Sequence, residues 1–165
     1  MEEIFKKVLG QKIKKIIYSE VNHHEGKFYF NGFDTFDHAI NVQMKSGYWW
    51  NLGWKDQDYF EIGKGYFKQN IHLNHNEIIF WEATDRWSEV INSTITDFKI
   101  TYIDDAKFIP SKIKINFENE KKITILITEE LKTDRLIPYP FDYEFGGEIY
   151  VIHNEKLLNE SKLKE

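Results

Sequence analysis

Apolar and polar residues alternate over most of the chain, a pattern that predicts β-strands with one buried face. Glycines and short polar runs separate the alternating segments, and such short connections favour antiparallel hairpins. The predicted strands are "KIKKIIYSEV", "KFYF", "AINVQM", "YWWNLGW", "YFEI", "ITDFKITYI", "SKIKINF" and "KKITILIT".

Helical spacing of apolar residues occurs in two short segments. Residues 2–9 have acidic residues in the first turn and lysines in the last, and Gly10 follows as a stop, so they predict an N-terminal helix. The segment 84–93, "TDRWSEVINS", predicts a second short helix with Thr84 or Asp85 as its cap.

The end of the chain, residues 154–165, is charged and has helical propensity, which predicts a weakly docked helical tail. With 165 residues the chain has the size of one ordinary domain. We therefore expect a single α+β domain over residues 1–165 that consists mainly of antiparallel β-sheet.

Two stretches of the chain resemble each other, residues 12–67 and residues 96–151. At a separation of 73 positions, six apolar residues match without gaps: Ile40, Val42, Met44, Trp50, Leu52 and Trp54 with Ile113, Ile115, Phe117, Ile123, Ile125 and Ile127. Flanking blocks match at a separation of 84, for example Ile16 with Ile100. The match predicts two similar β-units from a duplication, although any two antiparallel hairpins rich in Ile and Tyr align in this way.

Composition narrows the plausible partners and chemistry. Hydrophobic residues make up 41% and aromatic residues 16% of the chain, which excludes a disordered protein. The formal charge of -5 disfavours nucleic acid and anionic membranes and favours a basic partner. There is no cysteine, so disulfides, thiolate nucleophiles and cysteine-ligated zinc are excluded. Because neither a signal peptide nor a bilayer-spanning apolar run is recognisable, we expect a cytoplasmic protein.

The aromatic segment "YWWNLGW" divides into two sets of side chains because alternate residues of a strand share a face. Tyr48, Trp50, Leu52 and Trp54 are predicted to face the core. Trp49 points the other way, where a helix or a loop covers it or where it serves recognition.

Carboxylates follow this strand and recur near the end of the chain. Such clusters suit general acid–base chemistry, cation binding, a solvated rim or an acidic patch against a basic partner. The candidate binding residues are Trp49, Asp56, Asp58, Tyr59, Glu61, Asp142, Tyr143, Glu144 and Glu148.

Catalytic and metal-binding motifs are not recognisable in the sequence. His72 and His75 form an H-x-x-H pair without the glutamate of a zinc protease helix. Asp34, Asp37 and His38 lie close together, but "NGFDTFDH" is more typical of turn chemistry. We therefore predict no catalytic residue, no metal site and no cofactor, and a protein that is not an enzyme.

The segments "ITDFKITY", "KIKINFENEKKITILI" and "IPYPFDYEFGGEIYVIHN" are similar to segments of small uncharacterised bacterial proteins. Some of those proteins resemble immunity proteins of polymorphic or contact-dependent toxin systems. The resemblance covers mainly the second half of the chain and assigns no functional residue. It implies a rigid surface complementary to a toxin, commonly an acidic surface where the toxin is a nuclease.

The leading hypothesis is a non-enzymatic protein-binding module that neutralises a cognate toxin or another basic protein through an acidic, aromatic-containing surface. The alternative is a β-rich protein that binds or processes a small ligand in a pocket of aromatic and carboxylate side chains. A structural domain that forms oligomers is the third possibility.

Overall fold

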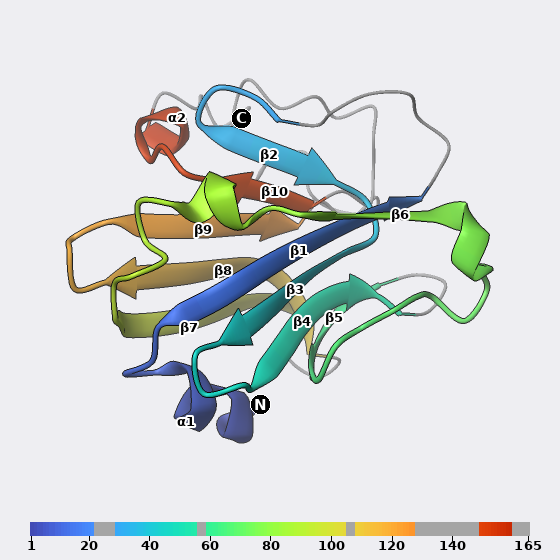
Figure 1. Cartoon of the computed structure of the whole chain (residues 1–165), viewed down its shortest axis with the longest axis horizontal. Helices are drawn as coiled ribbons and strands as arrows, with labels where there is room; N and C mark the ends of the chain where they lie inside the picture. The colour runs from blue at the N-terminus through green and yellow to red at the C-terminus, as the bar shows by residue number, and fades with distance from the viewer. Residues whose placement is uncertain (22–28, 56–58, 105–107, 128–148, 160–165) are drawn as a thin grey trace.

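The computed structural model of the chain describes residues 1–21, 29–55, 59–104, 108–127 and 149–159 (Figure 1). Ten strands lie in these residues: β1 (Ile13–Val21), β2 (Phe33–Phe36), β3 (Ala39–Met44), β4 (Trp49–Trp54), β5 (Phe60–Lys64), β6 (Ile78–Glu82), β7 (Ile95–Asp104), β8 (Ile109–Phe117), β9 (Lys122–Ile127) and β10 (Ile149–Ile152). The described helices are α1 (Glu2–Val8), α2 (Lys156–Asn159) and the 3-10 turns η1 (His75–Glu77) and η2 (Thr84–Trp87).

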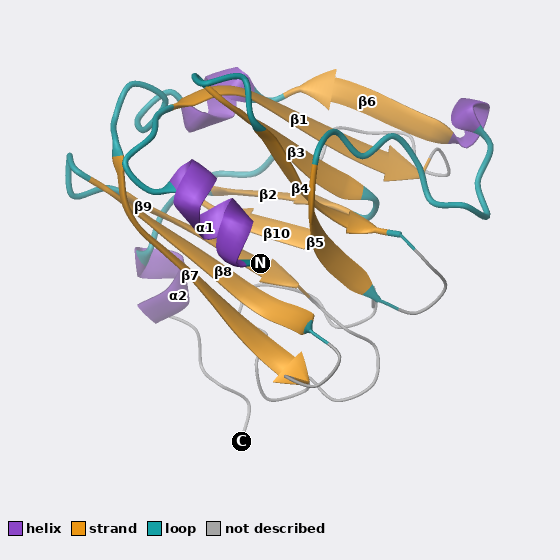
Figure 2. Cartoon of the chain, turned by 90° about the horizontal axis from the view of Figure 1, so that it is seen from below, coloured by secondary structure: helices purple, strands orange, loops and turns teal. Residues whose placement is uncertain are grey.

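The strands form two five-stranded antiparallel sheets. The first sheet has the order β5-β4-β3-β1-β6, and the second has the order β2-β10-β9-β8-β7. Figure 2 shows the two sheets as separate layers, with α1 between their edges at β5 and β7. The α+β class with mainly antiparallel sheet, predicted from the alternating pattern, is confirmed.

One hydrophobic core joins the two sheets. Its fully buried side chains come from the first sheet, such as Ile16, Val42 and Trp50, and from the second, such as Ile113 and Ile125. Full burial of an aliphatic side chain stabilises a fold by roughly 1.5–3 kcal/mol, so this shared core holds the layers together.

The predicted core face of β4 is confirmed. Trp50 and Leu52 are 0% exposed, and Tyr48 and Trp54 are half-buried and pack against the core. The opposite face, which was expected to be partly solvated, is covered as well, since Asn51 is 2% exposed.

A segment that we call the strap, residues 65–73, covers this outer face. Asn41 binds the backbone of Phe67 twice: its side-chain oxygen accepts from the Phe67 N–H at 2.7 Å, and its amide donates to the Phe67 carbonyl at 3.0 Å. The ring of Phe67 lies against Gly53, where an added Cβ would come within 2.5 Å of it. Only glycine permits this close approach.

The predicted helices are present in part. The N-terminal helix is confirmed as α1. The segment predicted as a helix over 84–93 contains only the 3-10 turn η2, and hydrogen-bonded turns follow it up to residue 92. Neither predicted cap is formed, since the hydroxyl of Thr84 instead accepts a hydrogen bond from the Ile16 N–H.

The predicted helical tail is described only for its first turn, α2, whose Leu158 packs against Tyr150 and Ile152. Residues 160–165 lie outside the described residues. None of the helices in the described ranges has the length and apolar character needed to cross a bilayer.

The two matching hairpins occupy equivalent places in the two sheets. Ile40 pairs with Leu52 in the first hairpin, and their counterparts 73 residues later, Ile113 and Ile125, pair in the second. The preceding strand is offset, because Ile16 pairs with Val42 whereas Ile100 pairs with Ile113. A separation of 82 rather than 84 therefore relates β1 to β7, and the duplication itself stays a hypothesis.

Candidate functional site

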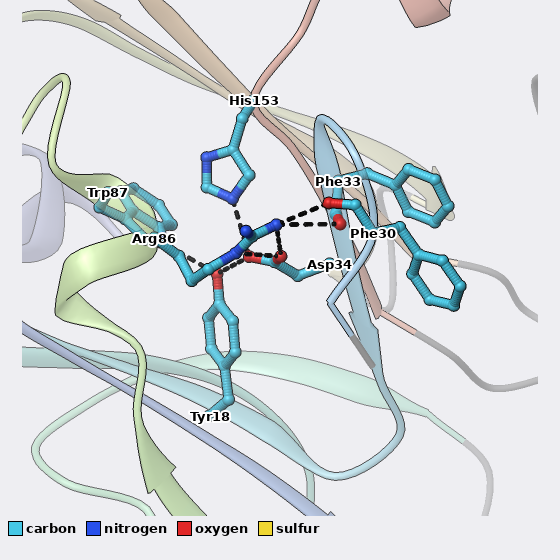
Figure 3. Close-up of polar contacts among 7 residues, drawn as sticks. All are labelled: Tyr18, Phe30, Phe33, Asp34, Arg86, Trp87 and His153. Atoms are coloured by element: carbon cyan, nitrogen blue, oxygen red, sulfur yellow. Dashed lines mark hydrogen bonds and ion pairs between the residues drawn. The ribbon is translucent and has the colours of Figure 1, made fainter. Parts of the chain in front are cut away.

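A cluster of polar side chains surrounds Asp34, at the second position of β2. Asp34 is 0% exposed. Its carboxylate accepts hydrogen bonds from the Tyr18 hydroxyl at 2.9 Å and from Arg86 Nε at 2.7 Å, and His153 Nε2 lies 2.7 Å away. Figure 3 shows these three side chains converging on Asp34.

These partners come from distant segments of the chain. Tyr18 belongs to β1 of the first sheet, Asp34 to β2 of the second, Arg86 to η2 and His153 to the turn after β10. The Asp34 cluster therefore ties the two sheets to the connection between them. A buried carboxylate is tolerated only where such partners replace its lost hydration.

The electrostatics of the cluster keep Tyr18 protonated. Burial raises the pKa of the Tyr18 phenol well above its ordinary value, and the negative charge of Asp34 raises it further. The neutral hydroxyl donates to Asp34 and accepts a hydrogen bond from Trp87 Nε1 at 2.7 Å. Tyr18 is thus a fixed structural donor.

Arg86 connects the buried carboxylate to the surface. Its Nη2 donates to the Phe30 carbonyl at 2.8 Å, and its guanidinium carbon lies 4.9 Å from the centre of the Tyr29 ring. The side chain is 31% exposed, so one edge of the anchored guanidinium reaches solvent.

Partly exposed aromatic side chains lie next to Arg86. Phe30 stacks on Phe33 with ring centres 4.7 Å apart, and Tyr29 contacts Trp81 edge-to-face at 6.3 Å. Ile79, two residues before Trp81 on β6, is 41% exposed. We call this surface the aromatic–arginine face and define it by Tyr29, Phe30, Phe33, Ile79, Trp81 and Arg86.

A pocket lies beside the same cluster. Its volume is about 130 Å³, and Arg86, Trp87, Lys121, Lys122 and His153 contribute to its lining. In Figure 3, Trp87 and the Phe30–Phe33 pair lie on opposite sides of the Asp34 cluster. Chemically, the cluster offers oriented cationic donors and one imidazole held by a carboxylate.

The structure places Trp49, the predicted recognition residue, outside both features. Its ring is half-buried and meets the Tyr66 ring edge-to-face at 5.1 Å. Tyr66, in the segment that follows β5, therefore partly covers Trp49. Cover by a loop was the alternative to a recognition role for this residue.

Trp49 does not lie beside the other described candidates. Because Trp50 pairs with Lys64 and Trp54 with Phe60, Trp49 and Tyr59 lie at opposite ends of the β4–β5 hairpin. A strand rises roughly 3.3 Å per residue, so they are about 20 Å apart. Neither lines the pocket beside Trp87.

Glu61 is exposed on β5 near Lys55. Burial lowers the pKa of the Lys55 ammonium, and the charge of Glu61 opposes this shift. The remaining candidates lie outside the described residues: Asp56, Asp58, Asp142, Tyr143, Glu144 and Glu148.

Asp34, Asp37 and His38 do not form a trio. Asp37 accepts a hydrogen bond from the Val21 N–H at 2.8 Å, whereas His38 lies between the first sheet and the strap. Its Nδ1 is 2.7 Å from the Ser19 hydroxyl, and its Nε2 accepts from the Asn70 N–H at 3.1 Å. Within the described parts of the chain, no group of three or more His, Asp or Glu side chains is arranged to hold a metal ion.

Sequence reasoning did not predict Arg86 or His153 as site residues. The only feature of the sequence that pointed to this cluster was Asp34, an acidic residue in a turn-like stretch. Arg86 and His153 are too far from Asp34 along the chain for the sequence to show that the three side chains meet. Comparison of the chain with protein-family models, curated proteins and solved structures finds no match.

Proposed function

We propose that the chain is a non-enzymatic protein-binding module of the immunity type, which neutralises a cognate bacterial toxin in the cytoplasm. The observation that carries the proposal is the aromatic–arginine face, because tryptophan, tyrosine and arginine dominate the energetic centres of protein interfaces. Phe30 and Ile79 are the most accessible apolar side chains of this face, at 46% and 41% exposure.

The face is rigid before any partner binds. Arg86 is fixed by Asp34 and by the Phe30 carbonyl, and Tyr29 is held between Arg86 and Trp81. A surface that is already ordered loses little conformational freedom on association, so more of its contact energy contributes to affinity.

Charge favours a basic partner. Glu82 and Asp85 are exposed next to the face, and the chain has a formal charge of -5. Acidic residues around an apolar centre accelerate encounter with a basic protein and discriminate against acidic ones.

Strand β6 adds a backbone edge to this surface. It pairs with β1 and is the last strand of its sheet in the described structure. Its sequence, "IIFWE", contains neither the lysine nor the proline with which edge strands are commonly protected against pairing with another chain. A partner segment that pairs here would gain main-chain hydrogen bonds beside the aromatic contacts.

The test is co-expression with the product of the neighbouring gene, followed by a pull-down and a growth assay. We expect a toxic, basic neighbour that this chain binds and neutralises. The double substitution Phe30→Ala/Ile79→Ala should weaken the complex about a hundredfold, since two exposed anchors at the centre of an interface contribute roughly 1–2 kcal/mol each.

A matched control removes exposed apolar side chains elsewhere. Ile71 and Phe108 are 74% and 62% exposed and lie outside the face, so Ile71→Ala/Phe108→Ala should leave the affinity unchanged. A neighbour that is harmless and does not bind contradicts the immunity function. A complex weakened equally by both double variants contradicts the assignment of the face.

A further inference from the structure

The pocket beside η2 has an apolar floor and charged walls. Trp87, Val90 and Ile123 contribute buried apolar surface. Its volume of about 130 Å³ is close to that of four water molecules at roughly 30 Å³ each. This is well below the roughly 300–1,000 Å³ of pockets for larger organic ligands, so the pocket suits a group of a few heavy atoms.

Two anchored side chains keep unused polar atoms at this pocket. Arg86 binds Asp34 and the carbonyls of Phe30 and Phe33 through Nε and Nη2, which leaves Nη1 without a partner among the described residues. His153 binds Asp34 through Nε2, so its Nδ1 is likewise free within the described structure. Both line the pocket.

Two lysines add further positive charge to the wall. Lys121 Nζ is 3.4 Å from a carboxylate oxygen of Glu89, and Lys122 Nζ is 3.5 Å from one of Glu155. Both lysine side chains are substantially exposed, at 54% and 41%. Such long, solvated ion pairs are weak, so either ammonium can turn to a ligand.

The cations of the pocket all have acidic partners. Its lining contains Arg86, Lys121 and Lys122 together with the carboxylate of Glu89. Arg86 is paired with the buried Asp34, whereas the two lysines have the solvent-accessible partners Glu89 and Glu155. Binding of an anion therefore requires the two lysines to turn from these weak pairs into the pocket.

We propose that this pocket binds a phosphate-type oxyanion, either free phosphate or the phosphate group of a small molecule. Arg86 donates from Nη1 and the two lysines from the rim, so the donors approach from several directions, as a tetrahedral anion requires. With Nε2 of His153 donating to Asp34, Nδ1 is the ring nitrogen left to accept a hydrogen bond from the hydroxyl of a hydrogen phosphate, which sulfate lacks.

The experiment is calorimetric titration of the full chain with sodium phosphate at constant ionic strength, the balance being sodium chloride. We expect saturable binding that Lys121→Ala/Lys122→Ala weakens about tenfold, because two charge-assisted contacts are lost. The matched control Lys99→Ala/Lys112→Ala removes the same charge from exposed positions of the same sheet and should bind as the unmodified chain does. Circular dichroism of each variant verifies the fold.

Further ligands distinguish the source and the kind of anion. Phosphoserine that binds more tightly than inorganic phosphate indicates a phosphorylated molecule, and the reverse order indicates the free ion. Acetate or sulfate that binds as tightly as phosphate would overturn the proposal. So would the absence of saturable binding up to tens of millimolar phosphate, or equal weakening in both lysine double variants.

Discussion

Asp34 adds a buried polar link between the two sheets to their shared hydrophobic core. It is a buried carboxylate whose partners reach it from β1, from η2 and from the turn after β10. Breaking a buried ion pair costs more than the pair contributes, because the remaining charge loses its compensation. Asp34 therefore determines stability even though its cluster also borders the face and the pocket.

Replacement of Asp34 by asparagine should lower the free energy of unfolding by about 3 kcal/mol. The substitution keeps the size of the side chain but leaves Arg86 without a counter-charge, and the hydrogen bonds of Tyr18 and His153 must rearrange. Urea denaturation followed by circular dichroism measures the change.

The matched control is Asp85→Asn, because Asp85 is an exposed carboxylate on the same connection. A surface substitution of this kind should change stability by no more than about 0.5 kcal/mol. Equal losses in the two variants would show that the Asp34 cluster does not contribute specifically.

This cluster could not have been predicted from local spacing. Arg86 lies 52 residues and His153 119 residues after Asp34 in the sequence. Only the packing of β2 against η2 and β10 brings the three together. The predicted candidates were chosen because aromatic and acidic residues were neighbours in sequence. Neighbours such as Trp49 and Tyr59 turned out to lie at opposite ends of one hairpin.

At the scale of elements, the strap converts an outer sheet face into a second buried layer. It is held by polar side chains of the sheet: Asn41 binds Phe67, Asn51 binds the Gly65 carbonyl and His38 accepts from Asn70. The ring of His38 also stacks on Phe67, with ring centres 5.2 Å apart. The contact with Asn70 requires an unprotonated Nε2, so the attachment of the strap depends on pH.

Acidification should destabilise the chain through His38. Burial lowers its pKa from 6.5 to about 4. Between these values the unfolded chain binds a proton that the folded chain rejects, so stability is highest above pH 6.5 and is lost as the pH falls toward 4. The shift corresponds to about 3 kcal/mol.

Denaturation at pH 7 and at pH 4 measures this loss. The loss of stability between pH 7 and pH 4 should be about 3 kcal/mol greater in the unmodified chain than in His38→Gln, whose side chain does not titrate. His72→Gln removes an exposed histidine and should follow the unmodified chain. Identical pH dependence in the His38 and His72 variants would contradict the role of His38.

The two matching hairpins offer an internal comparison of turns. Gly47 and Glu120 occupy the same position in the turns before β4 and β9, and their φ angles are 90° and 66°. Glycine adopts this region without strain, whereas glutamate is strained there by roughly 1 kcal/mol.

Glu120→Gly should therefore raise the free energy of unfolding by up to about 1 kcal/mol, and Gly47→Ala should lower it by about the same amount. An added Cβ at Gly47 meets nothing within 4 Å, so the loss would reflect backbone strain alone. Thermal denaturation of both variants tests the pair, and a stabilising Gly47→Ala would contradict it.

Seven strands with clear alternation were predicted correctly, and three strands that lack it were missed: β2, β6 and β10, whose four residues are all buried. In β2, three consecutive residues, Asp34, Thr35 and Phe36, are buried, so its pattern resembles a polar turn. In β6, four apolar residues follow one another because both of its faces are partly covered. Residues 33–36 and 78–82 form strands because β2 pairs with β10 and β6 pairs with β1. Local sequence does not encode that pairing.

At the scale of the whole molecule, the two sheets share one core and neither has a complete core of its own. Val42 of β3 and Ile115 of β8 are both fully buried in the same cluster. The Tyr18–Asp34 hydrogen bond also crosses between the sheets. If the halves arose by duplication, they now fold as one unit, and two-state unfolding is expected.

Hydrogen exchange read out by mass spectrometry tests this cooperativity. Ile115→Val removes one methyl group from the second sheet and should cost roughly 0.5–1.5 kcal/mol. Because amides in a cooperative core exchange only through global unfolding, the slowest peptides of β3 and of β8 should lose the same free energy of protection. Val42→Ala, placed in the first sheet, should likewise affect both sheets equally. A loss confined to the substituted sheet in either variant would mean that the two layers open independently and that the shared core does not couple them.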